Sequence, residues 1–277
     1  MKFEEKISAV FAIVFLAVTV VPGMFSFGNL VSFYVSDEID YNEWTADLGN
    51  KLETDIAACF CHKYDFVNFN GAVRSILNQK EMNGVIKLNN RYLMTPCPYV
   101  SDELLQQNAN AVADLKTYLD KKGIGLIYAV TPYTVDKYDP QLPAGVQDYG
   151  NDNLDRFAGM LRKGGVEPLD FREVMHRDGI SAYEMIYRTD HHWNTKAGFY
   201  IYTKLAEQLE QMLGCRTDPK VREISNYTIT NYENWHLGSR GQRTGAYFSG
   251  SDDFHLITPR FETSIIEGGV MRVPMKT

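Results

Sequence analysis

A long stretch without charged side chains lies near the N-terminus and limits the architecture of this chain more than any other feature. Residues 7–36 contain no Asp, Glu, Lys, Arg or His. A helix that crosses a bilayer needs about 20 consecutive apolar residues, whereas a secretory signal peptide has a shorter apolar region and a small-residue cleavage site. Because bulky Met24, Phe25 and Phe27 follow the apolar core, we interpret residues 1–36 as an uncleaved membrane anchor. A cleaved signal segment and a buried helix of a soluble fold are the alternatives.

The residues that flank this stretch predict its orientation. Lys2 and Lys6 precede it, while Asp37 and Glu38 follow it. Lysine and arginine are enriched on the cytoplasmic side of membrane-spanning helices. We therefore expect a single-pass protein of the cell membrane whose main domain is extracytoplasmic.

Net charge and cysteine content narrow the range of functions. The chain carries 28 Lys and Arg against 35 Asp and Glu, a formal net charge of −7, and it has no long basic run. Nucleic-acid binding is therefore not expected. The cysteines Cys59, Cys61, Cys97 and Cys215 can oxidise in an exported chain, but their connectivity cannot be read from the sequence. No second pair of ligands follows Cys59 and Cys61 at a spacing typical of zinc, so we predict neither a metal nor a cofactor.

Residues 37–100 are predicted to form a helical linker followed by a β-hairpin. The part up to residue 82 looks mostly helical and amphipathic. In the segment NGVIKLNNRYLM, alternating apolar residues flank Asn89 and Asn90. This pattern is typical of two strands joined by a turn.

Residues 101–277 have the pattern of an α/β domain. Short apolar runs at 125–130 and 166–171 are typical of buried strands. Because strands alternate with helices, we predict a parallel sheet flanked by helices. The loop TPYTVDKYDPQLPAG follows the first strand, a place where open α/β sheets often carry functional residues. Helical spacing and capping signals predict helices at residues 102–120, 153–163, 172–179 and 195–213.

The stretch YRTDHHWNTKAGFYIY, residues 187–202, carries the main candidate site. In an extended segment, side chains at i and i+2 share a face, so Asp190 and His192 can meet while His191 points elsewhere. A carboxylate bonded to one imidazole nitrogen fixes the tautomer and leaves the other nitrogen as a general base. We therefore predict Asp190 and His192 as catalytic residues, and Trp193 as a residue that binds substrate by walling the site or stacking on a sugar.

Two other interpretations of these residues stay open. In one, the aspartate caps a turn and the histidines are surface or packing residues. In the other, Asp190, His191 and His192 bind a metal ion, although three adjacent residues are too crowded to supply three well-placed ligands alone.

The stretch resembles the signature of the DHHW family of bacterial envelope proteins, which is similar to the acetyltransferase-like proteins of alginate modification. The segments KEMNGVIKLNNRYLM, VTPYTVDKYDPQLP and HLGSRGQRTG resemble further parts of that family. The resemblance implies an SGNH-hydrolase-type fold and a Ser-His-Asp site in which Asp190 orients the base His192. It also implies acetyl transfer or ester hydrolysis on a cell-surface polysaccharide, with an acetyl-donating membrane protein as a further partner.

The resemblance places a nucleophilic serine in an Asp-Ser turn after a late strand, and no Asp-Ser dipeptide occurs in these 277 residues. Ser239 and Ser251 are candidates for the nucleophile, but their segments GSRG and SGSDD favour reading each as a loop residue. One expectation is a C-terminally incomplete piece of a membrane-anchored O-acetyltransferase or esterase. The alternative is a non-catalytic envelope protein that binds glycan or assists its assembly, which the aromatic residues Trp193, Tyr232 and Trp235 motivate.

Overall fold

The computed structural model describes residues 3–36, 56, 59–262, 265–267 and 270–272. The chain divides into two compact units, Met1–Phe69 and Asn70–Thr277. Much of the predicted helical linker, residues 37–55, lies outside the described residues. Helix α3 (Lys63–Ile76) includes the residues at which the two units meet in the sequence.

The first unit contains one long apolar helix, α1 (Phe3–Ser36). Its segment Lys6–Ser32 has 27 residues. The most apolar part of this segment has a mean hydropathy of 2.4 and is not buried. At about 1.5 Å per residue this segment is about 40 Å long, which exceeds the roughly 30 Å hydrocarbon core of a bilayer. The expected candidate for a membrane-spanning helix is therefore present. Pro22 lies inside the helix, and its carbonyl accepts a hydrogen bond from Ser26 Oγ at 2.6 Å.

An antiparallel meander lies near the start of the second unit. Its strands are β1 (Glu81–Met82), β2 (Val85–Lys87) and β3 (Leu93–Met94). The predicted hairpin is confirmed as β2 and β3, and the Leu88 N–H donates to the Tyr92 carbonyl across its turn at 2.8 Å. Strand β1 was not predicted. It is joined to β2 by Asn83 and Gly84, whose φ angles of 53° and 72° fit a two-residue hairpin turn.

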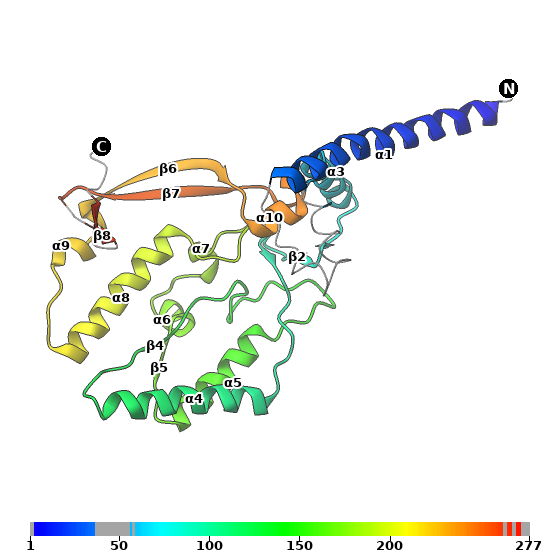
Figure 1. The fold of residues 1–277 in the computed structure, drawn as a ribbon. Coiled ribbons are helices and arrows are strands. Elements are labelled where there is room, and N and C mark those ends of the chain that lie inside the picture. Colours follow the sequence, from blue (N-terminus) through cyan, green and yellow to red (C-terminus); the bar gives the residue numbers. More distant parts are fainter. Residues whose placement is uncertain (1–2, 37–55, 57–58, 263–264, 268–269, 273–277) are drawn as a thin grey trace. The chain divides into compact units, whose positions relative to one another are not determined.

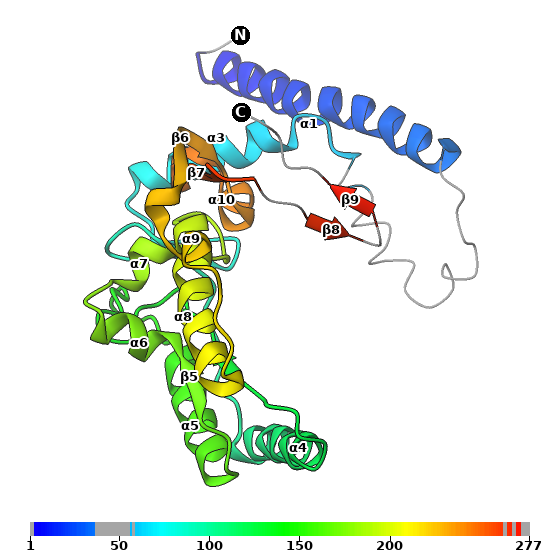
Figure 2. The same ribbon diagram turned by 90° about the vertical axis from the view of Figure 1, so that its left-hand side faces the viewer.

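The α/β part of the second unit follows the predicted alternation. Its elements are α4 (Asp102–Asp120), β4 (Tyr128–Val130), α5 (Gly150–Lys163), β5 (Pro168–Asp170) and α6 (Phe171–Arg177). Ser101 Oγ accepts the Leu104 N–H at 3.3 Å and caps α4, as expected. Helices α4 and α5 pack together in both views (Figures 1 and 2). The α/β class is confirmed, but the parallel sheet consists, among the described residues, of the single pair β4 and β5.

The later elements include a long antiparallel ribbon that the sequence did not predict in full. They are α7 (Ala182–Met185), α8 (Thr195–Leu213), α9 (Pro219–Arg222), η2 (Ile224–Asn226), β6 (Tyr227–His236), α10 (Ser239–Thr244), α11 (Ala246–Ser249), β7 (Asp252–Pro259), β8 (Ile265–Glu267) and β9 (Val270–Arg272). Strands β6 and β7 pair along most of their length and form the ribbon seen in Figure 1. Helix α8 matches its prediction, with the Asn194 side chain as its N-cap and Gly214 as its left-handed C-cap.

The loop after β4 contributes buried residues to the core. Val135 is fully buried in this loop and clusters with Ile86, Leu88 and Met94 of the meander region. Thr134 is also buried. The loop therefore packs against the meander region, and the functional role expected for it stays a prediction.

Candidate active site

The DHHW stretch folds as a tight loop between α7 and α8. Ile186 and Trp193 form an isolated antiparallel bridge, and the Tyr187 N–H donates to the His192 carbonyl at 3.3 Å. The residues between these two ends form bends rather than an extended strand. Consecutive side chains at the tip of the loop can therefore reach one place, which an extended strand would not allow.

The carboxylate of Asp190 is the centre of this loop, and the residue is buried. Its Oδ1 accepts the His191 main-chain N–H at 2.6 Å and lies 3.1 Å from His192 Nδ1. Its Oδ2 lies 3.3 Å from the Ser239 main-chain nitrogen and 3.3 Å from His236 Nε2. Burial alone would raise the pKa of this carboxyl, but the hydrogen bonds from His191, Ser239 and His192 outweigh it and lower the pKa to about 2. Asp190 is therefore ionised at neutral pH.

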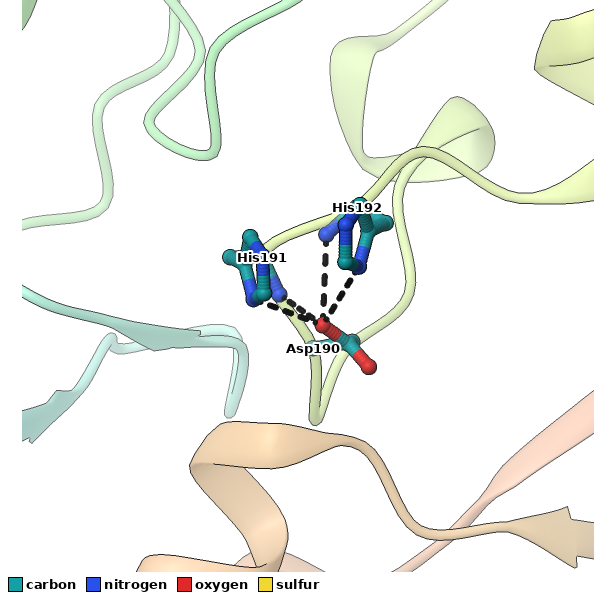
Figure 3. A group of neighbouring side chains, drawn as sticks. All are labelled: Asp190, His191 and His192. Atoms are coloured by element: carbon teal, nitrogen blue, oxygen red, sulfur yellow. Dashed lines mark hydrogen bonds and ion pairs between the residues drawn. The ribbon is translucent and has the colours of Figure 1, made fainter. Parts of the chain in front are cut away.

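His192 has the arrangement that a general base requires. Its Nδ1 faces Asp190, so its Nε2 lies on the far side of the ring, and 67% of the side chain is exposed. A carboxylate on Nδ1 holds the proton there and leaves the lone pair of Nε2 free to accept another. Figure 3 shows this contact between the two predicted residues. Their catalytic roles stay predictions.

His191 was expected to point away from Asp190, and this expectation is wrong. Its Nδ1 lies 2.9 Å from Asp190 Oδ1 and 2.9 Å from Ser239 Oγ. Both imidazole rings face the same carboxylate (Figure 3), with centroids 3.7 Å apart, because the loop is bent. Since Asp190 and Ser239 meet the same ring nitrogen, His191 cannot pass a proton between them through its two nitrogens as a triad histidine does.

Of the two serines weighed as nucleophiles, Ser239 reaches this site. It begins α10, and its main-chain nitrogen and Oγ each lie 3.3 Å from the Asp190 carboxylate. Ser251 Oγ instead donates to Asn234 Oδ1 at 3.3 Å. In the described part of the chain, no serine hydroxyl is hydrogen-bonded to a ring nitrogen of His192. Ser239 therefore holds Asp190 in place in this geometry, and it does not complete a triad through His192.

Gly238 allows α10 to approach Asp190 this closely. A Cβ at position 238 would lie 2.3 Å from the Cβ of Asp190. The φ of Gly238 is −70°, which any residue adopts, so space rather than backbone conformation requires glycine here. Its N–H donates to Thr189 Oγ1 at 2.9 Å.

Asp252, at the start of β7, holds the other side of the loop tip. Its Oδ1 accepts the Arg188 N–H at 2.8 Å. Its Oδ2 accepts the Thr189 N–H at 2.8 Å and the Thr189 hydroxyl at 2.5 Å. Thr189 is fully buried, so this carboxylate satisfies donors that would otherwise be left without partners.

Arg240 is the third support, and it is also buried. Its Nη1 donates to the Asp190 and Leu93 carbonyls at 2.9 Å each and to Thr134 Oγ1 at 3.0 Å. The side chain thus joins the site loop to the meander and to the loop after β4. In the sequence GSRG gave only a supporting resemblance, because nothing in a lone arginine reveals that its partners are two main-chain carbonyls and a threonine hydroxyl.

The predicted role of Trp193 and the possible metal site remain to be compared with the structure. Trp193 is partly exposed and pairs through its main chain with Ile186, and its predicted role as a substrate wall stays a prediction. The ligand atoms of Asp190, His191 and His192 lie within 4.8 Å of one another, which is close enough for one cation. However, the Asp190 carboxylate already accepts several N–H donors, so its position is explained by hydrogen bonding alone.

Comparison with known proteins identifies the domain. Residues 95–232 match the family model described as the SGNH hydrolase-like domain of the acetyltransferase AlgX. This range includes the DHHW loop but ends before the GSRG segment. None of the curated protein sequences matches the chain significantly.

Several solved structures are similar to this one. Bacillus cereus PatB1 with a sulfonyl adduct has 21% identity and a TM-score of 0.52, over 67% of this chain and 60% of PatB1. The O-acetyltransferase domain of Pseudomonas putida AlgJ has 17% identity and a TM-score of 0.49, over 64% of this chain and 66% of that domain. A DHHW family protein from Eubacterium siraeum has 17% identity and a TM-score of 0.39, over 66% of this chain and 56% of that protein.

The likeness to PatB1 supports the fold, and this chain spans only 60% of the PatB1 chain. The sequence-based expectation of an SGNH-hydrolase-like α/β domain is confirmed by the family model and by this fold. Residues 95–232 of this chain therefore form an SGNH hydrolase-like domain of the AlgX acetyltransferase family.

Proposed function

We propose that this protein is an SGNH-type O-acetyltransferase or esterase that acts on cell-surface polysaccharide. The observation that carries the proposal is the contact between His192 Nδ1 and the buried, ionised carboxylate of Asp190 at 3.1 Å, with 67% of the His192 side chain exposed. The family of residues 95–232 supports acyl transfer as the reaction class.

In this proposal His192 acts as base and then as acid. Nε2 removes the proton of a hydroxyl while that oxygen forms a bond to the acyl carbonyl carbon. The same proton is then given to the leaving oxygen as the carbon–oxygen bond to it breaks. Asp190 stabilises the imidazolium in between, and its lowered pKa keeps it charged for this purpose. Trp193, which follows the base in the sequence, is proposed to form one wall of the substrate-binding site.

The membrane helix and the partners belong to the same proposal. The segment Lys6–Ser32 is long and apolar enough to anchor the protein, and the lysines before it favour an extracytoplasmic main domain. The polysaccharide would then meet the domain outside the cytoplasm. A membrane protein that supplies acetyl groups is the proposed further partner, because acetyl transfer needs a donor.

A sulfonyl fluoride probe tests the proposal, since PatB1 is known with a sulfonyl adduct. The full chain is treated with phenylmethylsulfonyl fluoride, and the modified residue is mapped by mass spectrometry. We expect one modified hydroxyl in the wild type, little modification in His192→Ala, and unchanged modification in His191→Ala. The mapped residue identifies the nucleophile. Equal modification of the wild type and His192→Ala would contradict the role of His192.

A second candidate function is a glycan-binding or assembly protein without catalysis. The observation that favours it is that, among the described serines, none is hydrogen-bonded to a ring nitrogen of His192. The two candidates give different results with the same probe. A hydroxyl modified only in the presence of His192 supports the enzyme, whereas binding of glycan by a chain that is never modified supports the binding protein.

A further inference from the structure

Three aromatic side chains gather on the β6–β7 ribbon, and we name Tyr232, Trp235 and Phe254 the aromatic cluster. The ring centroids of Trp235 lie 5.5 Å from Phe254 and 6.0 Å from Tyr232, and those of Tyr232 and Phe254 lie 6.3 Å apart. Trp235 is 68% exposed and Tyr232 is 42% exposed. The rings therefore touch one another and still present much of their surface to solvent.

A break in the regular pairing of the ribbon creates this cluster. Tyr232 pairs with Phe254 and His236 with Asp252. Three residues of β6 therefore lie between these two pairs, opposite a single residue of β7. In a regular strand, residues at i and i+3 lie on opposite faces, and the extra residues of the bulge let Trp235 join Tyr232. Asn234 within the bulge has a φ of 49°, a left-handed conformation that asparagine adopts more often than most other residues with a side chain.

The bulge is held by specific contacts rather than left loose. Asn234 N–H donates to Asp253 Oδ1 at 2.8 Å, and Asn234 Oδ1 accepts from Ser251 Oγ at 3.3 Å. These contacts fix the bulge in which the exposed Trp235 lies. Bulges often re-aim a side chain beside an active site, which points to a binding role for Trp235.

The cluster adjoins the candidate active site through one residue. His236 follows Trp235 directly, and its Nε2 lies 3.3 Å from Asp190 Oδ2. Neighbouring Cα atoms are about 3.8 Å apart, so a polysaccharide of several sugars is longer than the backbone separation between Trp235 and His236.

The charges around the rings indicate which glycan fits. The ribbon segments 231–236 and 252–256 contain no lysine or arginine. Their exposed carboxylates are those of Glu233 and Asp253, because both oxygens of Asp252 accept hydrogen bonds from the DHHW loop. Carboxylates accept hydrogen bonds from sugar hydroxyls, and an aromatic face packs on the C–H face of a pyranose. The same carboxylates repel the acid groups of a uronate polymer.

We propose that the aromatic cluster binds an uncharged polysaccharide chain and presents it to the Asp190–His192 pair. This inference rests on the proposed function for the identity of the reaction, but binding itself needs no reaction. It assigns the acceptor subsite to the ribbon, outside the DHHW loop.

Titration calorimetry on the full chain in detergent micelles tests this proposal. The probes are cellohexaose and chitohexaose, which are uncharged, and an alginate hexasaccharide, which is anionic. His192→Ala serves as the background, so that binding is read without turnover and a failure of catalysis does not affect the result. Tyr247→Ala is the matched control, since Tyr247 is 72% exposed and lies on α11.

We expect an uncharged hexasaccharide to bind, Trp235→Ala to weaken that binding about tenfold, and Trp235→Phe to weaken it less. Tyr247→Ala should leave the affinity unchanged, and the alginate hexasaccharide should bind at least about tenfold more weakly. The proposal is overturned if neither uncharged hexasaccharide binds at about 1 mM, if Trp235→Ala binds as well as its background, or if alginate binds more tightly.

Discussion

Arg240 Nη1 donates a hydrogen bond to the carbonyl oxygen of Asp190 at 2.9 Å. The same nitrogen also bonds Leu93 and Thr134, so removing it leaves three buried acceptors with fewer partners. We expect Arg240→Ala to lower the free energy of unfolding by about 3 kcal/mol. Arg243→Ala is the matched control on the same helix. Arg243 is exposed, and its loss should cost about 0.5 kcal/mol.

Urea unfolding followed by circular dichroism measures both Arg240 and Arg243 variants. Equal destabilisation by the two variants would show that the contact between Arg240 and Asp190 has no special weight.

Gly238→Ala should disturb the site through space alone. The added Cβ would meet the Asp190 Cβ at 2.3 Å, so either α10 or the DHHW loop must move. We expect a loss of about 1–3 kcal/mol of stability, the range for overpacked sites. Gly159→Ala is the control, because nothing lies within 4 Å of a Cβ at that position in α5, and it should be neutral or stabilising by up to about 1 kcal/mol. If the two variants melt at the same temperature, the close approach of Gly238 to Asp190 is contradicted.

The ionised state of Asp190 predicts a pH dependence of stability. Its pKa in the folded protein is lowered to about 2, against about 3.9 in an unfolded chain. The unfolded state therefore binds the proton first, so the stabilisation from Asp190 is complete above about pH 4 and is lost as the pH falls toward 2. The stability difference between wild type and Asp190→Asn should fall by about 2 kcal/mol between pH 5 and pH 2. A difference that stays constant over this range would contradict the lowered pKa.

Charges placed in α1 test the membrane anchor. Val14 and Val18 are exposed in the apolar segment Lys6–Ser32. Each aspartate at the centre of a membrane helix costs about 3 kcal/mol on insertion scales. We expect Val14→Asp combined with Val18→Asp to move the protein from the membrane pellet to the carbonate-soluble fraction. The double leucine variant at the same positions should stay in the pellet. If the aspartate variant remains in the pellet, α1 is not the anchor.

Local signals in the sequence predicted those parts of the fold that local chemistry decides. The two ends of α8 were predicted from Asn194 and Gly214. A side-chain N-cap and a left-handed C-cap glycine each end a helix through contacts within a few residues. The hairpin of β2 and β3 followed from alternation around a polar turn. The turn at Asn83 and Gly84 carried an equally local signal, and strand β1 could have been predicted from it.

The site was only partly predictable because its supports come from distant segments. The contact between Asp190 and His192 was predicted from a spacing of two residues in an extended segment, and it is present although the segment is bent. The position of His191 was predicted wrongly, since the loop is bent by Asp252, which binds the main chain around Thr189 from 63 residues away. Arg240 likewise acts on Asp190 across 50 residues. Such partners are fixed by tertiary packing, which a single sequence does not display.

In the proposed function His192, and not His191, is the base that Asp190 orients. The most direct measurement is the kcat/KM of the full chain for p-nitrophenyl acetate in the wild type, His192→Ala and His191→Ala. We expect a loss of about 100-fold or more in His192→Ala, the usual contribution of general base catalysis. We expect a change within about threefold in His191→Ala, since a surface group that touches no reacting atom contributes little to the barrier. Full activity of His192→Ala would contradict the role of His192 as the base.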